Sequence, residues 1–180
     1  DGKPVGLVTG WYENGQKRYK GTFRDGERDG LSTQWYENGN KEFQVTYKDG
    51  EWDGLSTHWY ENGQKSMEST YKDGGKDGLE TQWYENGQKK WEFSYKDGNE
   101  VHETLWYENG QKHWEGTNKD DIKDGLWTFW YESGQKNQEQ LFKDGKIISW
   151  VKWTYKDGEK DGSLTNWYKN GQKKWEDIYK

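Results

Sequence analysis

Apolar and polar residues alternate along short stretches of this chain. In the segment 89–95, which reads KKWEFSY, tryptophan, phenylalanine and tyrosine fall on one side, and glutamate and serine fall on the other. A second kind of stretch, 31–36 (LSTQWY), is similarly short. Glycines interrupt every span longer than about ten residues, so a helix is implausible. The pattern therefore predicts two kinds of short β-strand.

These strands belong to a repeat. The sequence WYENGQK at residues 11–17 recurs in closely related copies that begin at Trp35, Trp59, Trp83, Trp106, Trp130 and Trp167. Most copies start 24 residues after the previous one, with one step of 23 residues and one of 37. Such a period is typical of stacked structural units. An active site needs its residues once, so the recurrence indicates architecture.

Each repeat contains two turn signals. Asn-Gly, as in Asn14-Gly15, favours a two-residue type I′ turn, in which both central residues have positive φ. The second signal is a glycine-rich connection such as 25–30 (DGERDG). The sequence therefore predicts an all-β fold: an elongated antiparallel meander of tandem hairpins with about 13 to 15 strands, in a single twisted sheet or an open solenoid.

The predicted turn also fixes a register. A two-residue loop at 86–87 places Tyr84 opposite Lys89 and Trp83 opposite Lys90. The Trp-Tyr pair then puts one ring on each face of the sheet in every repeat. Rings from successive repeats are expected to stack.

Composition decides how such a sheet is held together. Only 28% of the residues are hydrophobic and 33% are charged, but 18% are aromatic, with 14 Trp and 13 Tyr. Aliphatic residues are too few to fill a thick two-layer core, and the strict period argues against disorder. We expect a thin sheet stabilised by aromatic side chains that lie across neighbouring strands, each burying about 150–250 Å².

The motifs YENGQK and KDGxxDGL, which recur along nearly the whole chain, resemble the MORN repeat variant. That variant is found in bacterial proteins often labelled as antitoxins or immunity proteins of polymorphic toxin systems. The resemblance implies tandem β-hairpins in an elongated, twisted sheet that serves as a scaffold for many purposes. Residues 1–180 are expected to form a single array of about seven hairpin repeats.

Two segments depart from the repeat. The connection at 97–103 (DGNEVHE) is one residue short. Near 145–158 half a repeat is missing, because the stretch 146–155 lacks its Asn-Gly turn. This stretch is also the most aliphatic in the chain, and a longer strand, a kink or a join between two blocks is expected there.

Few residues carry a chemical signal. Asp25 and Asp29 lie beside glycines, but the ligand spacings of known calcium loops are absent, and Asp-Gly is what a turn requires. His58 and His113 occupy positions filled by other polar residues in sister repeats, and His102 lies in the irregular connection. No acid is singled out for glycoside hydrolysis. We expect no catalytic residue, no metal site and no cofactor.

The aromatic rows are the sharpest candidate for binding. They hold the sheet together in one interpretation; in the other, one row is exposed and contacts a ligand. Scaffold residues tend to repeat, whereas contact residues need not, so aromatic residues at variable positions are the candidates. These are Tyr19, Phe43, Trp52, Trp91, Trp114, Trp127, Phe129 and Trp150.

The net charge of −6, with both signs interspersed, argues against binding to nucleic acid or lipid headgroups. The sequence predicts a non-enzymatic scaffold that binds a protein partner, and the resemblance makes neutralisation of a toxin by occlusion the most concrete version. The alternatives are carbohydrate or cell-surface binding by an aromatic ladder, and a fibre built by edge-to-edge self-association. An antitoxin-like protein is expected in the bacterial cytoplasm, and a glycan binder or fibre at the cell surface or outside it.

Overall fold

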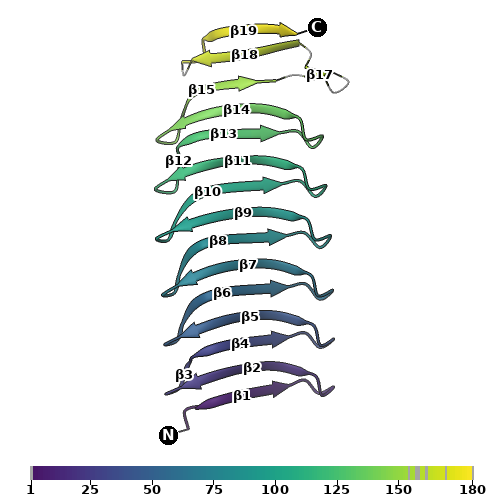
Figure 1. Cartoon of the computed structure of the whole chain (residues 1–180), viewed down its shortest axis with the longest axis vertical. Helices are drawn as coiled ribbons and strands as arrows, with labels where there is room; N and C mark the ends of the chain where they lie inside the picture. Colours follow the sequence, from purple (N-terminus) through teal and green to yellow (C-terminus); the bar gives the residue numbers. More distant parts are fainter. Residues whose placement is uncertain (1, 154, 157–158, 161, 169, 180) are drawn as a thin grey trace. The chain divides into compact units, whose positions relative to one another are not determined.

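The computed structural model describes residues 2–153, 155–156, 159–160, 162–168 and 170–179. Within these residues all regular structure is β-strand. Seventeen strands belong to one open sheet with antiparallel pairing, and β16 (Tyr155–Lys156) and β17 (Glu159–Lys160) pair with each other. The prediction of an all-β fold of tandem antiparallel hairpins is confirmed (Figure 1).

The chain divides into two compact units. The first comprises Asp1–Gln88 and Ser94–Gly98. Its strands follow one another as an antiparallel meander in chain order. They are β1 (Gly6–Trp11), β2 (Lys17–Arg24), β3 (Glu27–Arg28), β4 (Gly30–Trp35), β5 (Lys41–Lys48), β6 (Glu51–Trp59), β7 (Lys65–Lys72) and β8 (Gly75–Trp83).

The second unit comprises Lys89–Phe93 and Asn99–Lys180, and β9 (Lys89–Lys96) contributes residues to both units. The remaining strands of this unit are β10 (Asn99–Trp106), β11 (Lys112–Lys119), β12 (Ile122–Lys123), β13 (Gly125–Trp130), β14 (Lys136–Lys143), β15 (Lys146–Lys152), β18 (Gly162–Tyr168) and β19 (Lys173–Tyr179).

Four strands of the two units, β3, β12, β16 and β17, contain two residues each. The other fifteen strands of the described residues match the predicted number.

The Asn-Gly turns are three-residue loops, so the predicted two-residue type I′ turn at this position is wrong. In the first loop, the N–H of Gly15 donates to the carbonyl of Tyr12 (3.0 Å), and the N–H of Tyr12 donates to the carbonyl of Gln16 (2.8 Å). Gly15 has a φ of 84°, whereas Asn14 keeps a negative φ. This is a type I turn followed by a left-handed glycine.

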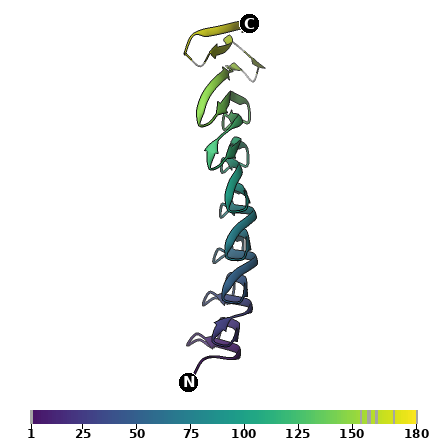
Figure 2. The ribbon, with the colours of Figure 1, turned by 90° about the vertical axis from the view of Figure 1, so that its left-hand side faces the viewer.

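The type I′ turns lie at the second turn signal, the glycine-rich connection such as 25–30. Arg24 pairs with Glu27, which leaves Asp25 and Gly26 as a two-residue loop with φ of 52° and 89°. Aspartate tolerates this left-handed conformation better than most residues do. In the first unit, and in the second unit as far as β15, the three-residue loops lie along one side of the sheet and the two-residue turns along the other (Figure 1). Figure 2 views the hairpins from the side of the two-residue turns.

The longer loop changes the register that we predicted. The N–H of Tyr84 donates to the carbonyl of Gln88 (2.9 Å), so Tyr84 faces Gln88 and not Lys89. In the preceding hairpin Trp59 pairs with Lys65, while His58 pairs with Met67, and a β-bulge separates these two pairs. The motif tryptophan therefore faces the motif lysine, because the loop contains one residue more than predicted.

The motif residues join each repeat to the next. The hydroxyl of Tyr12 donates to the carbonyl of Trp35 (2.6 Å), and the side-chain amide of Asn14 donates to the carbonyl of Glu37 (3.0 Å). The ammonium group of Lys17 lies 6.0 Å from the centroid of the Trp35 ring. In the described residues these contacts, and not ring stacking, join the first motif to the second. The tyrosine bond recurs in both units, at Tyr36, Tyr60 and Tyr107.

The two faces of the first unit differ in character. We call one the aromatic face, because it carries Tyr19, Phe43, Tyr47, Trp52 and Tyr71. Small serines lie buried among these rings. We call the other the leucine face, because Leu7, Leu31, Leu55 and Leu79 lie on it, one in each repeat.

The last hairpin is inverted relative to the others in the second unit. Trp150 of β15 lies opposite Gln140 on one side and opposite Trp167 on the other. In the regular hairpins the motif tryptophan alternates with residues such as Phe129, but here Trp167 shares the face of Trp150, and their rings stack with centroids 5.0 Å apart. Of the predicted irregular segment near 145–158, residues 154, 157 and 158 lie outside the described residues.

Candidate functional site

The structure brings the three predicted binding residues of the first unit onto the aromatic face. Tyr19 pairs with Gln34, and Gln34 pairs with Phe43 on its other side, so the two rings share this face. The centroids of the Phe43 and Trp52 rings are 5.6 Å apart. All three predicted side chains are half-buried. A contact that spans several repeats is therefore available on one face.

In the second unit, four of the five predicted residues also share a face. Trp114 pairs with Phe129, which alternates with Trp127 along β13, and Gln140 links Trp127 to Trp150. On β9, the ring of Trp91 stacks on Phe93 with centroids 4.7 Å apart. The variable aromatic positions are thus brought together by register, although they are far apart in the sequence.

Trp127 does not offer a contact surface, because its side chain is fully buried. Its indole N–H donates to the carbonyl of Thr117 (3.0 Å), and its ring packs edge-on to Phe142 with centroids 5.9 Å apart. The expectation that Trp127 belongs to a binding surface is therefore not met. This residue stabilises the sheet.

Cations alternate with the rings, which sequence reasoning missed. The guanidinium group of Arg28 lies 5.7 Å from the ring of Tyr19 and 5.2 Å from that of Tyr47, and it donates to the Tyr47 hydroxyl (2.7 Å). In the second unit the ammonium group of Lys123 lies 3.7 Å from the Trp127 ring. Both cations occupy the position of Trp52 in the repeat. A comparison of this position between repeats could have identified them from the sequence.

Glu80 is a buried carboxylate on the aromatic face. One oxygen accepts from the Ser69 hydroxyl (3.1 Å), and the other accepts from the ammonium group of Lys76 (2.6 Å) and the hydroxyl of Tyr95 (3.1 Å). Ser56 occupies the equivalent position in the preceding repeat. Because these donors surround the carboxylate and only 4% of the residue is exposed, Glu80 has a structural role here.

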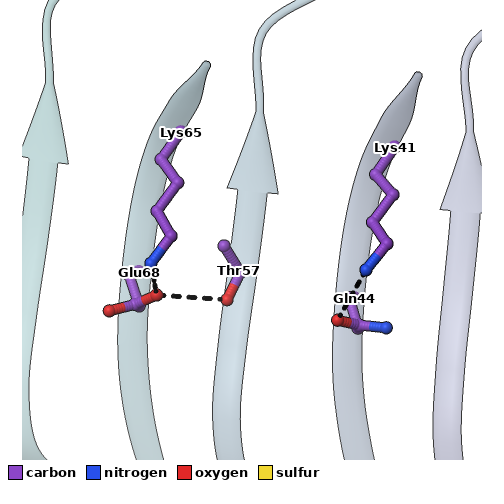
Figure 3. Close-up of polar contacts among 5 residues, drawn as sticks. All are labelled: Lys41, Gln44, Thr57, Lys65 and Glu68. Atoms are coloured by element: carbon purple, nitrogen blue, oxygen red, sulfur yellow. Dashed lines mark hydrogen bonds and ion pairs between the residues drawn. The ribbon is translucent and has the colours of Figure 1, made fainter. Parts of the chain in front are cut away.

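The polar residues near the loops on the leucine face form pairs (Figure 3). The Lys65 ammonium group forms an ion pair with Glu68, whose carboxylate also accepts from the Thr57 hydroxyl (3.4 Å). In the preceding repeat, Lys41 donates to the side-chain carbonyl of Gln44 (3.3 Å). These lysines also lie against the tryptophan of the next repeat, at 5.8 Å and 5.2 Å.

The histidines and the turn aspartates are engaged within the sheet. Burial lowers the pKa of His58, whose ring lies 4.4 Å from Phe43, and the pKa of His113 is also lowered by burial. His102 is within 3.1 Å of the Thr104 hydroxyl. Asp124 accepts from the Lys143 ammonium group (3.0 Å), which agrees with a turn role for these acids. The residues that the structure describes contain no cluster of His, Cys, Asp and Glu that could hold a metal ion.

Among the described residues, none lies in a helix long and apolar enough to cross a membrane.

Comparison with known proteins identifies the repeat. A family model described as the MORN repeat variant matches residues 4–25, 28–49, 52–73, 76–97 and 123–144. These segments cover more than half of the chain. A search of curated proteins finds no match.

Proposed function

Because this chain belongs to the MORN repeat variant family, we propose that its repeat scaffold binds a protein partner through the aromatic face of the first unit and the corresponding aromatic residues of the second. The proposal is non-enzymatic: the scaffold acts by covering a surface of its partner. In its most specific form the partner is a toxin whose working surface is occluded, as the family resemblance suggests.

One observation carries this proposal. Aromatic residues that vary between otherwise constant repeats, such as Phe43 and Trp52 in the first unit and Trp114 and Phe129 in the second, share a face within their unit. They are half-buried, so each ring has an edge or face left for contact. Partly covered, rigid aromatic side chains are enriched at protein interfaces because they bury much area with little loss of conformational freedom.

The cations among the rings favour a partner that carries acidic side chains. Arg28 is held between Tyr19 and Tyr47 by its ring contacts and its hydrogen bond. A guanidinium group fixed in this way is pre-organised to bind a carboxylate. The aromatic face therefore suits a protein surface on which acidic side chains lie beside apolar ones.

The test uses variants that the sheet already accommodates. Trp91 and Trp114 each follow the motif lysine by two residues, and Gln138 occupies the same position in a later repeat. We expect the full chain carrying Trp91→Gln and Trp114→Gln to fold, but to lose at least tenfold in affinity for a protein that co-purifies with the unmodified chain. Leu126→Gln, at an exposed position outside the candidate residues, is the matched control.

Binding is measured by calorimetry with the purified partner, and folding by urea unfolding. Equal affinity of the Trp91→Gln/Trp114→Gln chain and the unmodified chain would refute the proposal. So would turnover of any substrate by the purified chain. A tryptophan fluorescence change with oligosaccharides, in the absence of any protein partner, would favour the carbohydrate alternative.

A further inference from the structure

The leucine face of the first unit carries a column of exposed apolar side chains. Leu7, Leu31, Leu55 and Leu79 are 62%, 52%, 50% and 55% exposed, whereas the predicted aromatic residues are half-buried or buried. Scattered exposed leucines are ordinary in soluble proteins, but an aligned row marks an interaction surface. This row is separate from the aromatic face on which the proposed function depends.

Register places a small residue between successive leucines. Leu7 lies opposite Thr22, Leu31 opposite Thr46, and Leu55 opposite Thr70. Neighbouring strands are about 4.8 Å apart, so the leucines recur every ~10 Å with threonine in each gap. The column therefore alternates large and small side chains at the spacing of single strands.

Such a column is complementary to a second copy of itself. When one copy is shifted by a single strand spacing, its leucines lie over the threonines of the other copy. Both signs of charge flank the column: Arg24 forms ion pairs with Asp29 and Asp49 near the two-residue turns, and Lys65 pairs with Glu68 near the loops. Because each flank carries both positive and negative groups, two such faces can meet without repulsion between charges of the same sign.

The size of the face fits a stable contact. The first unit has seven long strands. At about 4.8 Å per strand and ~20 Å in length, they offer roughly 700 Å², close to the ~800 Å² per partner of a standard interface. An apolar centre with a polar rim is also the usual anatomy of an interface.

We propose that two copies of this chain pack face to face through the leucine face of the first unit, with leucines of one copy over threonines of the other. The contact leaves the aromatic face free. A dimer therefore presents two partner-binding faces that point away from each other.

Analytical ultracentrifugation of the full chain at roughly 10⁻⁶ to 10⁻⁴ M tests the proposal. We expect a reversible dimer for the unmodified chain, and a shift of at least tenfold toward monomer for Leu31→Arg/Leu55→Arg. Leu126→Arg is the matched control, because Leu126 is 53% exposed but lies opposite Leu141 in the second unit, where the alternation is absent. It should leave the dimer unchanged.

A second variant distinguishes shape complementarity from non-specific hydrophobic association, and it introduces no charge that could destabilise the fold. Thr46→Leu/Thr70→Leu adds apolar surface but fills the gaps, so we expect it to weaken the dimer. A chain that stays monomeric over the whole range would overturn the proposal and leave the leucine face to a different protein. Stronger association of Thr46→Leu/Thr70→Leu, or a dimer that survives in folded Leu31→Arg/Leu55→Arg, would overturn it as well.

Discussion

The indole of Trp127 lies directly over Gly116 of the neighbouring strand. A Cβ atom added to Gly116 would come within 2.2 Å of the Trp127 ring, and the Trp127 side chain is fully buried. In earlier repeats the position equivalent to Trp127 is occupied by serine, as at Ser32 and Ser56. A large ring at this position requires the absence of a side chain opposite, so these two residues form one packing unit.

We therefore expect Gly116→Ala to lower the free energy of unfolding by about 1–3 kcal/mol, because the added methyl group overpacks the site. Urea unfolding followed by tryptophan fluorescence measures the change. Gly10→Ala is the control, since the nearest atom to its added Cβ lies 4.0 Å away. Adding Trp127→Ser to Gly116→Ala should remove the clash, and strict additivity of the two changes would contradict this account.

The tyrosine hydroxyl that joins successive repeats should contribute measurably to stability. The Tyr36 hydroxyl donates to the carbonyl of Trp59 (2.8 Å). We expect Tyr36→Phe to cost about 0.5–1.5 kcal/mol in the free energy of unfolding. Tyr168→Phe is the matched control, because Tyr168 has the same motif position but is 50% exposed. Equal effects of the two substitutions would show that the inter-repeat bond is not the cause.

Glu80 and Lys76 should behave as a pair. Glu80→Ser places the residue of the preceding repeat at this position, but it leaves the Lys76 ammonium group and the Tyr95 hydroxyl without their acceptor. We expect a loss of about 1–3 kcal/mol in unfolding free energy. The double change Lys76→Trp/Glu80→Ser copies Trp52 and Ser56 and should recover most of it. Failure of the double variant to recover would contradict the pairing.

Stability should fall as the pH drops through the histidine range. Burial lowers the pKa of His58 in the folded chain, so the unfolded chain binds more protons just below the ordinary histidine pKa of about 6.5. The corresponding part of the stability is present above that pH and is lost as the pH falls toward the lowered pKa. His58→Gln, which copies Gln34 and Gln82, should reduce the slope.

Urea unfolding at about pH 7.5 and about pH 5 measures this slope for the two proteins. The acidic residues contribute equally to both, so the difference between them isolates His58. Identical slopes would mean that the half-buried imidazole beside Phe43 does not contribute to the pH dependence of stability.

Turn chemistry shows why sequence prediction stopped short. Asn-Gly and Asp-Gly both permit a type I′ turn, and the assignment of that turn to Asn14-Gly15 was wrong. The Asn14 side chain accepts from the N–H of Gln16 (2.9 Å) and donates to the carbonyl of Glu37 in the next repeat. The second bond depends on a neighbour 23 residues away, which a local turn rule does not include.

The candidate site was predicted in part for a related reason. Variation between repeats pointed to Tyr19, Phe43 and Trp52, which the register places together. It also pointed to Trp127, which is buried, because variability reveals only that a position differs and not whether it is exposed. Arg28 was not predicted, because a cation in a polar connection does not belong to any apolar pattern.

The sequence by itself determined the strands, the repeat and the antiparallel order, because alternation, glycine placement and period are local properties of the chain. Only the tertiary structure decided which turn is left-handed at both residues, which rings are covered, and that the column of Leu7, Leu31, Leu55 and Leu79 remains open. Those outcomes depend on side chains of neighbouring repeats. The exposure of a side chain and the register of a loop are set by the residues that the neighbouring strand places beside them.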